Sequence, residues 1–348
     1  MPQSQYKSTA SVLPTHTPAL FQKAVEAAAG LLRAGEVVAV PTETVYGLAA
    51  NAFDAHAVEH IFQVKGRPAH NPIIVHVAGV EMARKCAREW PGIADRLAKA
   101  FWPGPLTLVL PRETSIPDTV TAGGNTVGIR WPSHPFVQAL IRACGFPLAA
   151  PSANLSNRLS PTNADHVAAQ IGDRIRLIVD GGQCQVGIES TVLDVSVSPP
   201  RLLRPGMIHE QALLAITREL GTGTGKAAGI LRSPGQLDRH YSPKAPLEIW
   251  RWDDEAHLRS LSSRSRVAPR QMHIVAHTRI PSGVGFGGVS VIPHDPEAFA
   301  RALYAELHSC DQAGAELIIM EALPETSEWR ALADRLNRAA VVPFAPKP

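Results

Sequence analysis

Apolar segments with two different periodicities alternate along the first two hundred residues. Residues 18–34 carry apolar side chains at helical spacing between Pro18 and Gly35, which predicts a helix with those boundaries. Short apolar runs bounded by turn residues predict strands. The same criteria predict helices near 55–64, 80–88, 93–101, 134–143 and 162–171, and strands at 36–40, 73–77, 106–110, 126–131, 147–150, 176–180, 191–195 and 201–204. Because helices and strands mix irregularly, we expect an α/β domain with a twisted, mixed sheet.

The pattern changes after a predicted helix over 211–220. The next residues, up to Gly235, are rich in glycine and polar side chains, which is typical of a linker. A second alternation follows, with strands at 247–252, 272–277 and 316–321 and helices at 296–309 and 327–339. We therefore expect a second, smaller α/β unit, and a length of 348 residues also favours two domains.

Two glycine motifs resemble phosphate-binding loops but lack the required context. Gly225-Lys226 would need Gly at 220 and Ser or Thr at 227, where the chain has Leu220 and Ala227. Residues 283–288 fit GxGxxG, but they lead into an apparent strand, whereas a dinucleotide site needs a helix N-terminus. We expect neither motif to bind phosphate.

Composition narrows the class of protein. Hydrophobic residues make up 45% and charged residues 19%, an ordinary globular balance, and a net charge of +3 is too small for a nucleic-acid-coating protein. Four scattered cysteines without CxxC spacing, and 14 histidines without HExxH pairing, argue against a zinc site or a disulfide framework. Because no signal segment and no stretch of 18 apolar residues are found, we expect a cytoplasmic protein without membrane association.

Five polar clusters lie beside predicted strands. In chain order they are PTETVYGL (41–48), KGRP (65–68), GIRWP (128–132), PSAN (151–154) and GIESTVLD (187–194). In the second cluster, Lys65 and Arg67 stand one residue apart in a Gly/Pro turn. Such a turn can hold a polyphosphate, because Coulomb attraction strengthens in a partly shielded loop, although by itself it can equally be a solvated basic loop.

The other clusters also allow two readings each. Arg130 falls in a segment that should be buried, so it needs a carboxylate or phosphate partner, which can be internal, for instance Glu43 or Glu189. The short polar side chains of PSAN, with Ser160 and Thr162 soon after, can cap the following helix or contact the phosphates of a nucleotide.

Taken together and in this order, the clusters resemble the Sua5/YrdC family of threonylcarbamoyl-AMP synthases. The motifs that carry the resemblance are PTETVYGL, KGRP..NPIIVHV, FWPGPLTLVL, VGIRWP, PSANLS....SPT, VDGG, GIESTVLD and LLRPG. Further along, SPG (233–235) with RHYSP (239–243) resembles the interdomain linker of the two-domain Sua5 type, and EALPE (321–325) with DRLNRAA (334–340) resembles its C-terminal domain. The chain departs from the family at 327–330, SEWR, where a glycine-rich turn usually precedes the last helix.

The resemblance implies a fold and an activity. The fold would be a YrdC-like twisted α/β sandwich with a large concave pocket over 15–212, a linker or lid over 213–246, and a smaller Rossmann-like α/β domain over 247–345. The activity would be a nucleotidyl transfer that forms L-threonylcarbamoyl-AMP from L-threonine, bicarbonate or CO2, and ATP, with Mg2+ bound through the ATP phosphates and pyrophosphate released. This is the first step of N6-threonylcarbamoyladenosine (t6A37) formation in tRNA, and a separate transferase complex would take the product.

The family's binding positions carry over onto matching residues of this sequence. Those expected to bind threonine are Thr44, His76, Arg130, Ser152 and Ser190, with Arg130 facing the threonine carboxylate. Those expected to bind ATP are Lys65, Arg67, Asn71, Thr126, Asn154, Ser160, Thr162, Arg204 and, from the linker, Tyr241; spacing does not decide between Ser160 and Thr162. Lys65 and Arg67 would also be the catalytic cations, and no protein-built metal site is expected.

Two other functions compete with the synthase. A YrdC-type RNA-binding module without catalysis would use the same basic loops to hold a tRNA or ribosomal RNA backbone with strong, salt-dependent affinity, but the low net charge and the absence of aromatic stacking platforms argue against it. A carbamoyl-transfer enzyme of hydrogenase maturation would carry zinc-finger and acylphosphatase segments, which this chain lacks.

Overall fold

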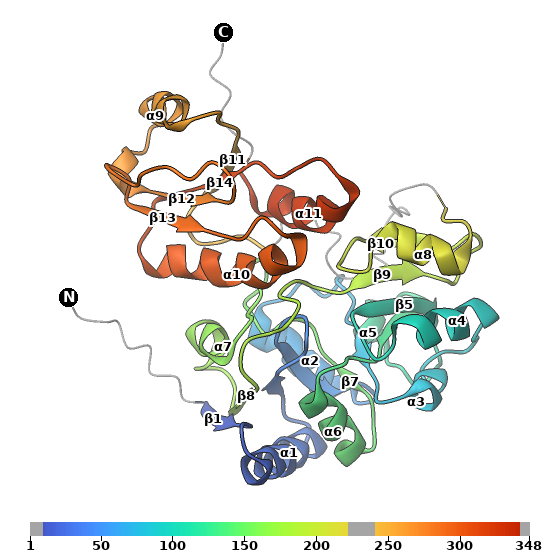
Figure 1. Ribbon diagram of the computed structural model, residues 1–348. Coiled ribbons are helices and arrows are strands. Elements are labelled where there is room, and N and C mark those ends of the chain that lie inside the picture. Colours follow the sequence, from blue (N-terminus) through green and yellow to red (C-terminus); the bar gives the residue numbers. More distant parts are fainter. Residues whose placement is uncertain (1–9, 222–240, 342–348) are drawn as a thin grey trace. The chain divides into compact units, whose positions relative to one another are not determined.

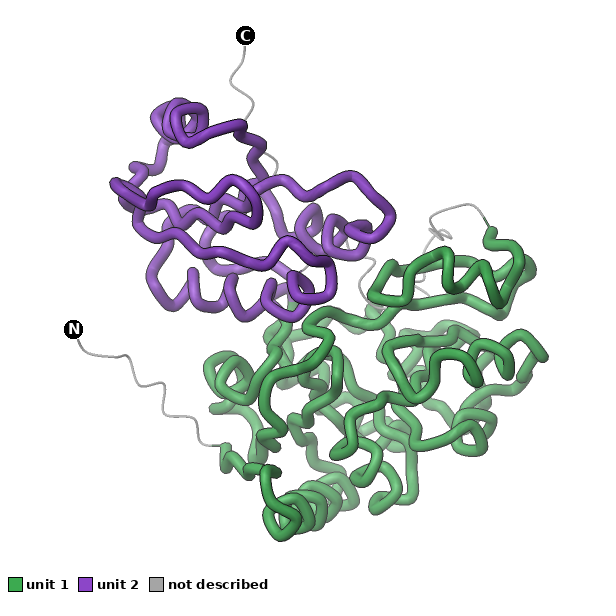
Figure 2. Tube along the Cα trace, in the orientation of Figure 1, with its two compact units in different colours: residues 1–156, 160–237 green, residues 157–159, 238–348 purple. Residues whose placement is uncertain are grey.

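The computed structural model describes residues 10–221 and 241–341, which divide into two compact units (Figures 1 and 2). Of the described residues, unit 1 holds those up to Ser156 and those from Ser160 to Gly221, and unit 2 holds Asn157–Leu159 and the residues from Tyr241 onward. Much of the expected linker, with its SPG motif and the Gly225-Lys226 pair, lies outside the described residues. The domain boundaries at 212 and 246 stay predictions.

Ten strands of unit 1 form one mixed sheet in the order β1-β8-β2-β3-β7-β4-β6-β5-β9-β10. They are β1 (Ser11–Pro14), β2 (Val38–Val40), β3 (Gly47–Asn51), β4 (Val75–His76), β5 (Leu106–Pro111), β6 (Thr126–Arg130), β7 (Leu148–Ala149), β8 (Leu177–Asp180), β9 (Thr191–Asp194) and β10 (Arg201–Arg204). Within it, β4 and β6 run parallel and β5 and β6 antiparallel. This confirms the mixed α/β sheet.

Helices cover both faces of this sheet. They are α1 (Pro18–Arg33), α2 (Ala55–Lys65), α3 (Val80–Arg84), α4 (Gly92–Phe101), α5 (Asp118–Thr121), α6 (Pro135–Cys144), α7 (Ala164–Ile171) and α8 (Glu210–Thr217). Along β2, Val38 and Val40 enter the core made with α1 and α6, whereas Ala39 enters the core made with α2, α4 and α7. Because both faces are buried, such strands read as continuous apolar runs rather than alternating ones.

Unit 2 is built on a four-stranded, all-parallel sheet in the order β11-β14-β12-β13. The strands are β11 (Leu247–Trp250), β12 (Met272–Ala276), β13 (Gly288–Val291) and β14 (Leu317–Glu321); the helices are α9 (Glu255–Ser263), α10 (Pro296–Gln312) and α11 (Arg330–Ala339), with short 3-10 turns η1 (Pro269–Gln271) and η2 (Ser327–Trp329). Parallel neighbours require crossover connections, so a Rossmann-like α/β arrangement results, as expected.

Some elements were not expected from the pattern. Strand β3, GLAAN, has small residues and no alternation, and it forms because β2 and β7 pair with it on both sides. Helix α9 is poor in apolar residues, but the Asp254 side chain caps it by accepting the His257 N–H at 2.8 Å. Strand β1 and helix α5 were not expected either. The strand expected at 73–77 is shorter in the structure, where β4 covers only Val75–His76. The GxGxxG segment does lead into a strand, β13, as predicted.

No helix within residues 10–221 and 241–341 combines the length and the hydropathy that crossing a bilayer requires.

Candidate active site

Arg130, the last residue of β6, is buried and lies at the centre of one polar cluster. Its Nη1 donates to Thr44 Oγ1 at 2.9 Å, its Nε donates to the Gly104 carbonyl at 3.3 Å, and its Nη2 lies 2.6 Å from Glu43 Oε1. His76 stands directly opposite Arg130 in the parallel β4/β6 register. Three residues expected to bind threonine (Thr44, His76 and Arg130) thus come together, and Glu43 is the internal carboxylate that the sequence left as one option.

The charges of this cluster are fixed by burial and by one another. Burial opposes ionisation of Glu43, but the adjacent Arg130 outweighs it and lowers the pKa of the carboxyl group. Burial, together with the positive charge of Arg130, lowers the pKa of His76 to about 3. His76 is therefore a neutral imidazole at physiological pH, beside a guanidinium that makes two hydrogen bonds and one ion pair among the described residues and has N–H donors to spare.

A second cluster joins Ser190 to Arg204, the last residue of β10. The Arg204 guanidinium donates to the Ser190 carbonyl at 3.0 Å and to Ser190 Oγ at 3.1 Å, and Ser190 Oγ lies 2.8 Å from Thr107 Oγ1. All three side chains are buried. A residue expected to bind threonine and one expected to bind ATP are therefore in direct contact.

A third cluster lies at the C-terminal end of α2. The buried Lys65 Nζ donates to the carbonyls of Ser152 and Asn154, each at 2.5 Å, and burial, with the nearby Arg67 charge, lowers the pKa of the lysine well below its usual range. Gly66 ends the helix in the left-handed conformation, with φ of 59°, which lets the chain turn at once into Arg67. Lys65 is therefore not part of a solvated basic loop, which the sequence had left as an alternative.

Arg67 holds the backbone at Asn71 in place. Arg67 donates from Nε to the Asn71 carbonyl at 3.1 Å and from Nη2 to the Pro72 carbonyl at 2.7 Å. The Asn71 side chain is fully buried, and neither its oxygen nor its nitrogen has a partner among the described residues. A buried amide without partners is costly, which points to a ligand or water at this position.

A fourth cluster contains Ser160 and Thr162. Ser160 Oγ donates to Glu189 Oε1 at 2.6 Å, whereas the Thr162 hydroxyl and N–H both lie 3.3 Å from His166 Nδ1. Both residues are completely buried. The geometry leaves the choice between them as a nucleotide ligand open, as spacing did.

Backbone hydrogen bonds connect the loops that carry these clusters. Val186 N donates to the Glu43 carbonyl at 2.7 Å, Tyr46 N donates to the Pro161 carbonyl at 2.8 Å, and Ala153 N donates to the Tyr46 carbonyl at 2.8 Å. Segments more than a hundred residues apart are thereby held in one layer. This arrangement gathers several fixed cations and short hydroxyl groups, which suits recognition of an amino acid and of phosphate groups.

Residues 30–206 match the family Sua5_yciO_yrdC, described as Telomere recombination, and residues 207–341 match Sua5_C, described as Threonylcarbamoyl-AMP synthase, C-terminal domain. The chain belongs to the Sua5 family of threonylcarbamoyl-AMP synthases. Among its relatives in this family, the threonylcarbamoyl-AMP synthase of Bacillus subtilis is 41% identical over 338 residues, covering 94% of each chain. That of Pyrococcus abyssi is 38% identical over 322 residues, covering 91% of this chain and 94% of the relative.

A solved structure of this Sua5 family extends the similarity to three dimensions. The crystal structure of P. abyssi Sua5 complexed with L-threonine superimposes with a TM-score of 0.86 at 36% identity, covering 95% of this chain and 98% of that one. The likeness therefore includes both domains of the Sua5 type.

The remaining expected site residues are Thr126 and Tyr241. Thr126 is half-buried at the start of β6, where it pairs with Pro111 of β5. Tyr241 belongs to unit 2, where its buried ring lies 6.0 Å from that of Tyr304 and 5.6 Å from the Arg335 guanidinium carbon. The expected place of Tyr241 over the nucleotide stays a prediction.

Two residues outside the expected threonine- and ATP-binding sets also shape the site. Thr107 was included only in the apolar run of β5, although a hydroxyl group within LTLVL is the kind of signal that could have singled it out. Thr42 orders the PTET turn, because its Oγ1 donates to the Val45 carbonyl at 2.6 Å and accepts from Thr44 N at 3.2 Å.

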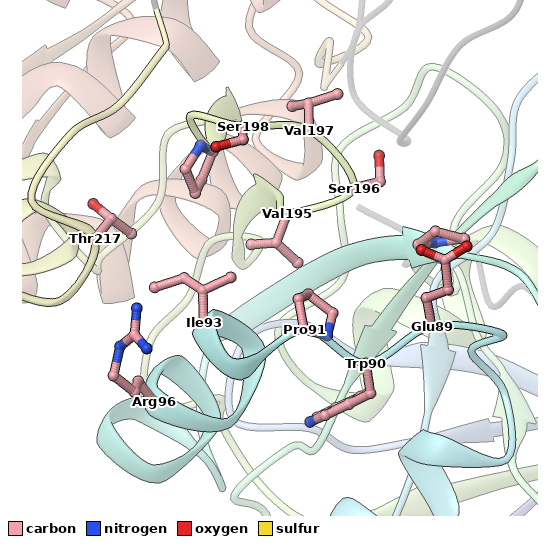
Figure 3. Close-up of a pocket in the computed structure, with 12 residues that line it drawn as sticks. Glu89, Trp90, Pro91, Ile93, Arg96, Val195, Ser196, Val197, Ser198 and Thr217 are labelled. Atoms are coloured by element: carbon pink, nitrogen blue, oxygen red, sulfur yellow. The ribbon is translucent and has the colours of Figure 1, made fainter.

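A separate cavity of unit 1 is not part of this site. It measures about 630 Å3 and is lined by Trp90, Ile93, Val195, Ser196 and Thr217, among others (Figure 3). None of the residues expected to bind threonine or ATP lines it.

Proposed function

We propose that this chain makes L-threonylcarbamoyl-AMP from L-threonine, bicarbonate or CO2, and ATP, and releases pyrophosphate. The observation that carries the proposal is the buried Arg130 with Thr44 and the neutral His76 beside it, in a chain that belongs to the Sua5 family. A buried guanidinium with N–H donors to spare is suited to the threonine carboxylate, which can accept two parallel hydrogen bonds. The P. abyssi relative with L-threonine bound supports threonine as the substrate.

The remaining residues take roles that match their chemistry. Ser152 and Ser190 complete the threonine site with Thr44, His76 and Arg130. Lys65, Arg67 and Arg204 neutralise the triphosphate of ATP, and Asn71, Thr126, Asn154, Ser160, Thr162 and Tyr241 contact the rest of the nucleotide. The partnerless amide of Asn71 supports a ligand there, since binding would satisfy a polar group that is otherwise buried without a hydrogen bond.

The reaction needs positioning more than a protein nucleophile. The threonine nitrogen forms a bond to the carbon of CO2 and loses a proton to solvent, which gives a carbamate. A carbamate oxygen then attacks the α-phosphorus of ATP while the bond to the pyrophosphate oxygen breaks. Fixed cations such as Lys65 and Arg67 stabilise the charge that moves onto pyrophosphate.

Magnesium fits this site through the nucleotide rather than through a protein cage. The two buried carboxylates among the site loops are already engaged, Glu43 by Arg130 and Glu189 by Ser160. The phosphate oxygens of ATP and water would then supply most of the Mg2+ ligands, because this ion usually keeps several waters and binds substrate phosphates. When bound, the ion neutralises phosphate charge.

The biological setting follows from the same proposal. The product would supply the threonylcarbamoyl group for t6A37 of tRNA through a separate transferase complex, and we expect at most weak contact with tRNA itself. The cytoplasmic location predicted from the sequence suits this role, because tRNA modification of this kind requires ATP and tRNA in one compartment.

The test is pyrophosphate release from ATP with Mg2+ and bicarbonate, with and without L-threonine, followed by mass analysis of the adenylate. We expect release that depends on threonine, together with the mass of threonylcarbamoyl-AMP. Folded protein that releases no pyrophosphate under any condition, but binds RNA with a steep salt dependence, would instead support the RNA-binding module.

A further inference from the structure

A second cavity of interest lies in unit 2, at the carboxyl ends of its parallel strands. It measures about 500 Å3, and the residues that line it follow every strand of the sheet. Arg251 follows β11, His277 to Arg279 follow β12, His294 follows β13, and Ala322 to Pro324 follow β14. In open α/β sheets this edge is where ligands bind, because the loops after the strands converge there.

The side chains of this cavity are mostly cationic or able to donate hydrogen bonds. Arg251 and Arg279 are exposed, and their guanidinium groups come from two different loops. His277 and His294 stack with ring centroids 4.9 Å apart, and their Nδ1 atoms lie 2.7 Å from each other. The exposed His294 ring also lies 5.1 Å from Trp329, which belongs to the SEWR stretch where this sequence departs from its family.

A buried carboxylate fixes the loop after β12, which carries Arg279. Glu321, at the end of β14, is 2% exposed and accepts the N–H groups of His277 at 2.7 Å, Thr278 at 2.9 Å and Arg279 at 3.2 Å. The Thr278 hydroxyl donates to the same carboxylate. The backbone N–H groups that would commonly cradle a phosphate are therefore already taken. A ligand in this cavity would be held by side chains, and Glu321 fixes the loop that carries one of them, Arg279.

The acidic groups nearby do not cancel the cavity's preference for anions. The charge of Glu321 is satisfied inside the loop. Arg251 pairs with Glu325 at 3.3 Å, but the two side chains are 68% and 90% exposed, and such an exposed ion pair is weak and easily exchanged. Arg279 lies 3.7 Å from Glu321 and remains about half-exposed.

We propose that the carboxyl-end cavity of unit 2 binds a phosphate group, either as free inorganic phosphate or on a small phosphorylated molecule. Donors on three loops, Arg251, Arg279 and His294, can surround a tetrahedral anion from several sides, whereas one arginine fork suffices for a planar carboxylate. A cavity of this volume accommodates a sugar phosphate. The proposal does not depend on the catalytic role of unit 1.

The experiment is isothermal titration calorimetry of the full-length chain with inorganic phosphate and, separately, with ribose 5-phosphate. The test variant is Arg251→Gln/Arg279→Gln. The matched control is Arg264→Gln/Arg270→Gln, which removes two exposed arginines near the opposite, amino-terminal edge of the same sheet, where Arg264 ends α9 and Arg270 precedes β12. Lys65→Met reports any phosphate bound in unit 1.

At the unit 2 cavity we expect the wild type, the matched control and Lys65→Met to bind with equal affinity, whereas Lys65→Met should lose any separate binding event in unit 1. The test variant should bind at the unit 2 cavity at least about tenfold more weakly, as for the loss of charge-assisted hydrogen bonds. In histidine-labelled protein, the NMR signal of His294, identified with His294→Asn, should shift with the same dissociation constant. Tighter binding of ribose 5-phosphate would identify an ester as the ligand, and tighter binding of inorganic phosphate would identify the free ion. No binding to the wild type, equal affinity in all variants, or an unmoved His294 signal would each overturn the proposal.

Discussion

In unit 1 the cations Lys65, Arg130 and Arg204 are only 2 to 4% exposed, whereas in unit 2 Arg251 and Arg279 are exposed on loops. The buried cations each have carbonyl, hydroxyl or carboxylate partners, so they contribute to the fold as well as to the site. Of the exposed cations, Arg279 lies on a loop that a single buried carboxylate, Glu321, holds through its backbone N–H groups. We therefore expect substitutions of the unit 1 cations to lower both stability and activity. Substitutions of the exposed unit 2 arginines should weaken ligand binding and leave the free energy of unfolding nearly unchanged.

The largest effect should follow from Arg130→Met. Removing the guanidinium leaves Glu43 buried without a counter-charge, which costs about 3–5 kcal/mol of unfolding free energy, and pyrophosphate release should also be lost. The double variant Arg130→Met/Glu43→Met removes both charges and should regain most of the stability without regaining activity. Denaturant unfolding and the threonine-dependent assay measure the two quantities. A double variant as unstable as the single one would contradict the argument.

Lys65→Met should lower threonine-dependent pyrophosphate release by about 100-fold or more. The variant loses a positioned phosphate donor, whose ammonium form the negative triphosphate favours against burial, at the point where charge develops. The methionine keeps most of the volume, but the carbonyls of Ser152 and Asn154 lose their shared donor, at a cost of about 1–3 kcal/mol. Lys85→Met, at an exposed lysine, is the control. Full activity of the Lys65 variant would refute the role assigned to this lysine.

The buried His76 should make stability depend on pH. Its pKa is lowered to about 3 in the fold, from 6.5, so below pH 6.5 the unfolded chain binds a proton that the folded chain does not. Above pH 6.5 His76 therefore does not lower the free energy of unfolding. As the pH drops from 6.5 toward 3 the free energy of unfolding falls, and at pH 5 the loss due to His76 is about 2 kcal/mol. His76→Gln should flatten the slope of unfolding free energy between pH 7 and 5, whereas His70→Gln, at an exposed histidine, should not. An unchanged slope in the His76 variant would show that other groups cause it.

The smallest effect is expected in unit 2, from Glu321→Gln. The amide nitrogen would face the backbone N–H groups of the loop after β12, which costs about 1–2 kcal/mol locally. Hydrogen exchange of a peptide covering residues 272–280 should become faster, and it should not in Glu325→Gln, an exposed neighbour. Slow exchange retained in the Glu321 variant would mean that the loop does not need this carboxylate.

Much of the fold was readable from the chain because local signals agreed with the final structure. Helix α1 begins with Thr17 as its cap and Pro18 in its first turn, and both act within the helix itself. By contrast, β3 and β4 are defined by their neighbours. The sequence GLAAN has no pattern of its own, and two residues of β4 qualify as a strand only because β6 and β7 pair with them.

The amino-acid sequence by itself determined the two α/β units, the positions of the polar clusters and the family to which they belong, because periodicity, turn residues and ordered motifs are local properties of the chain. Only the tertiary structure decided which residues meet. It chose Glu43 rather than Glu189 as the partner of Arg130, brought Thr107 to Ser190, and gathered loops after four strands around one cavity. These contacts join residues far apart in sequence, so strand order and register set them, and neither is encoded by any short segment alone.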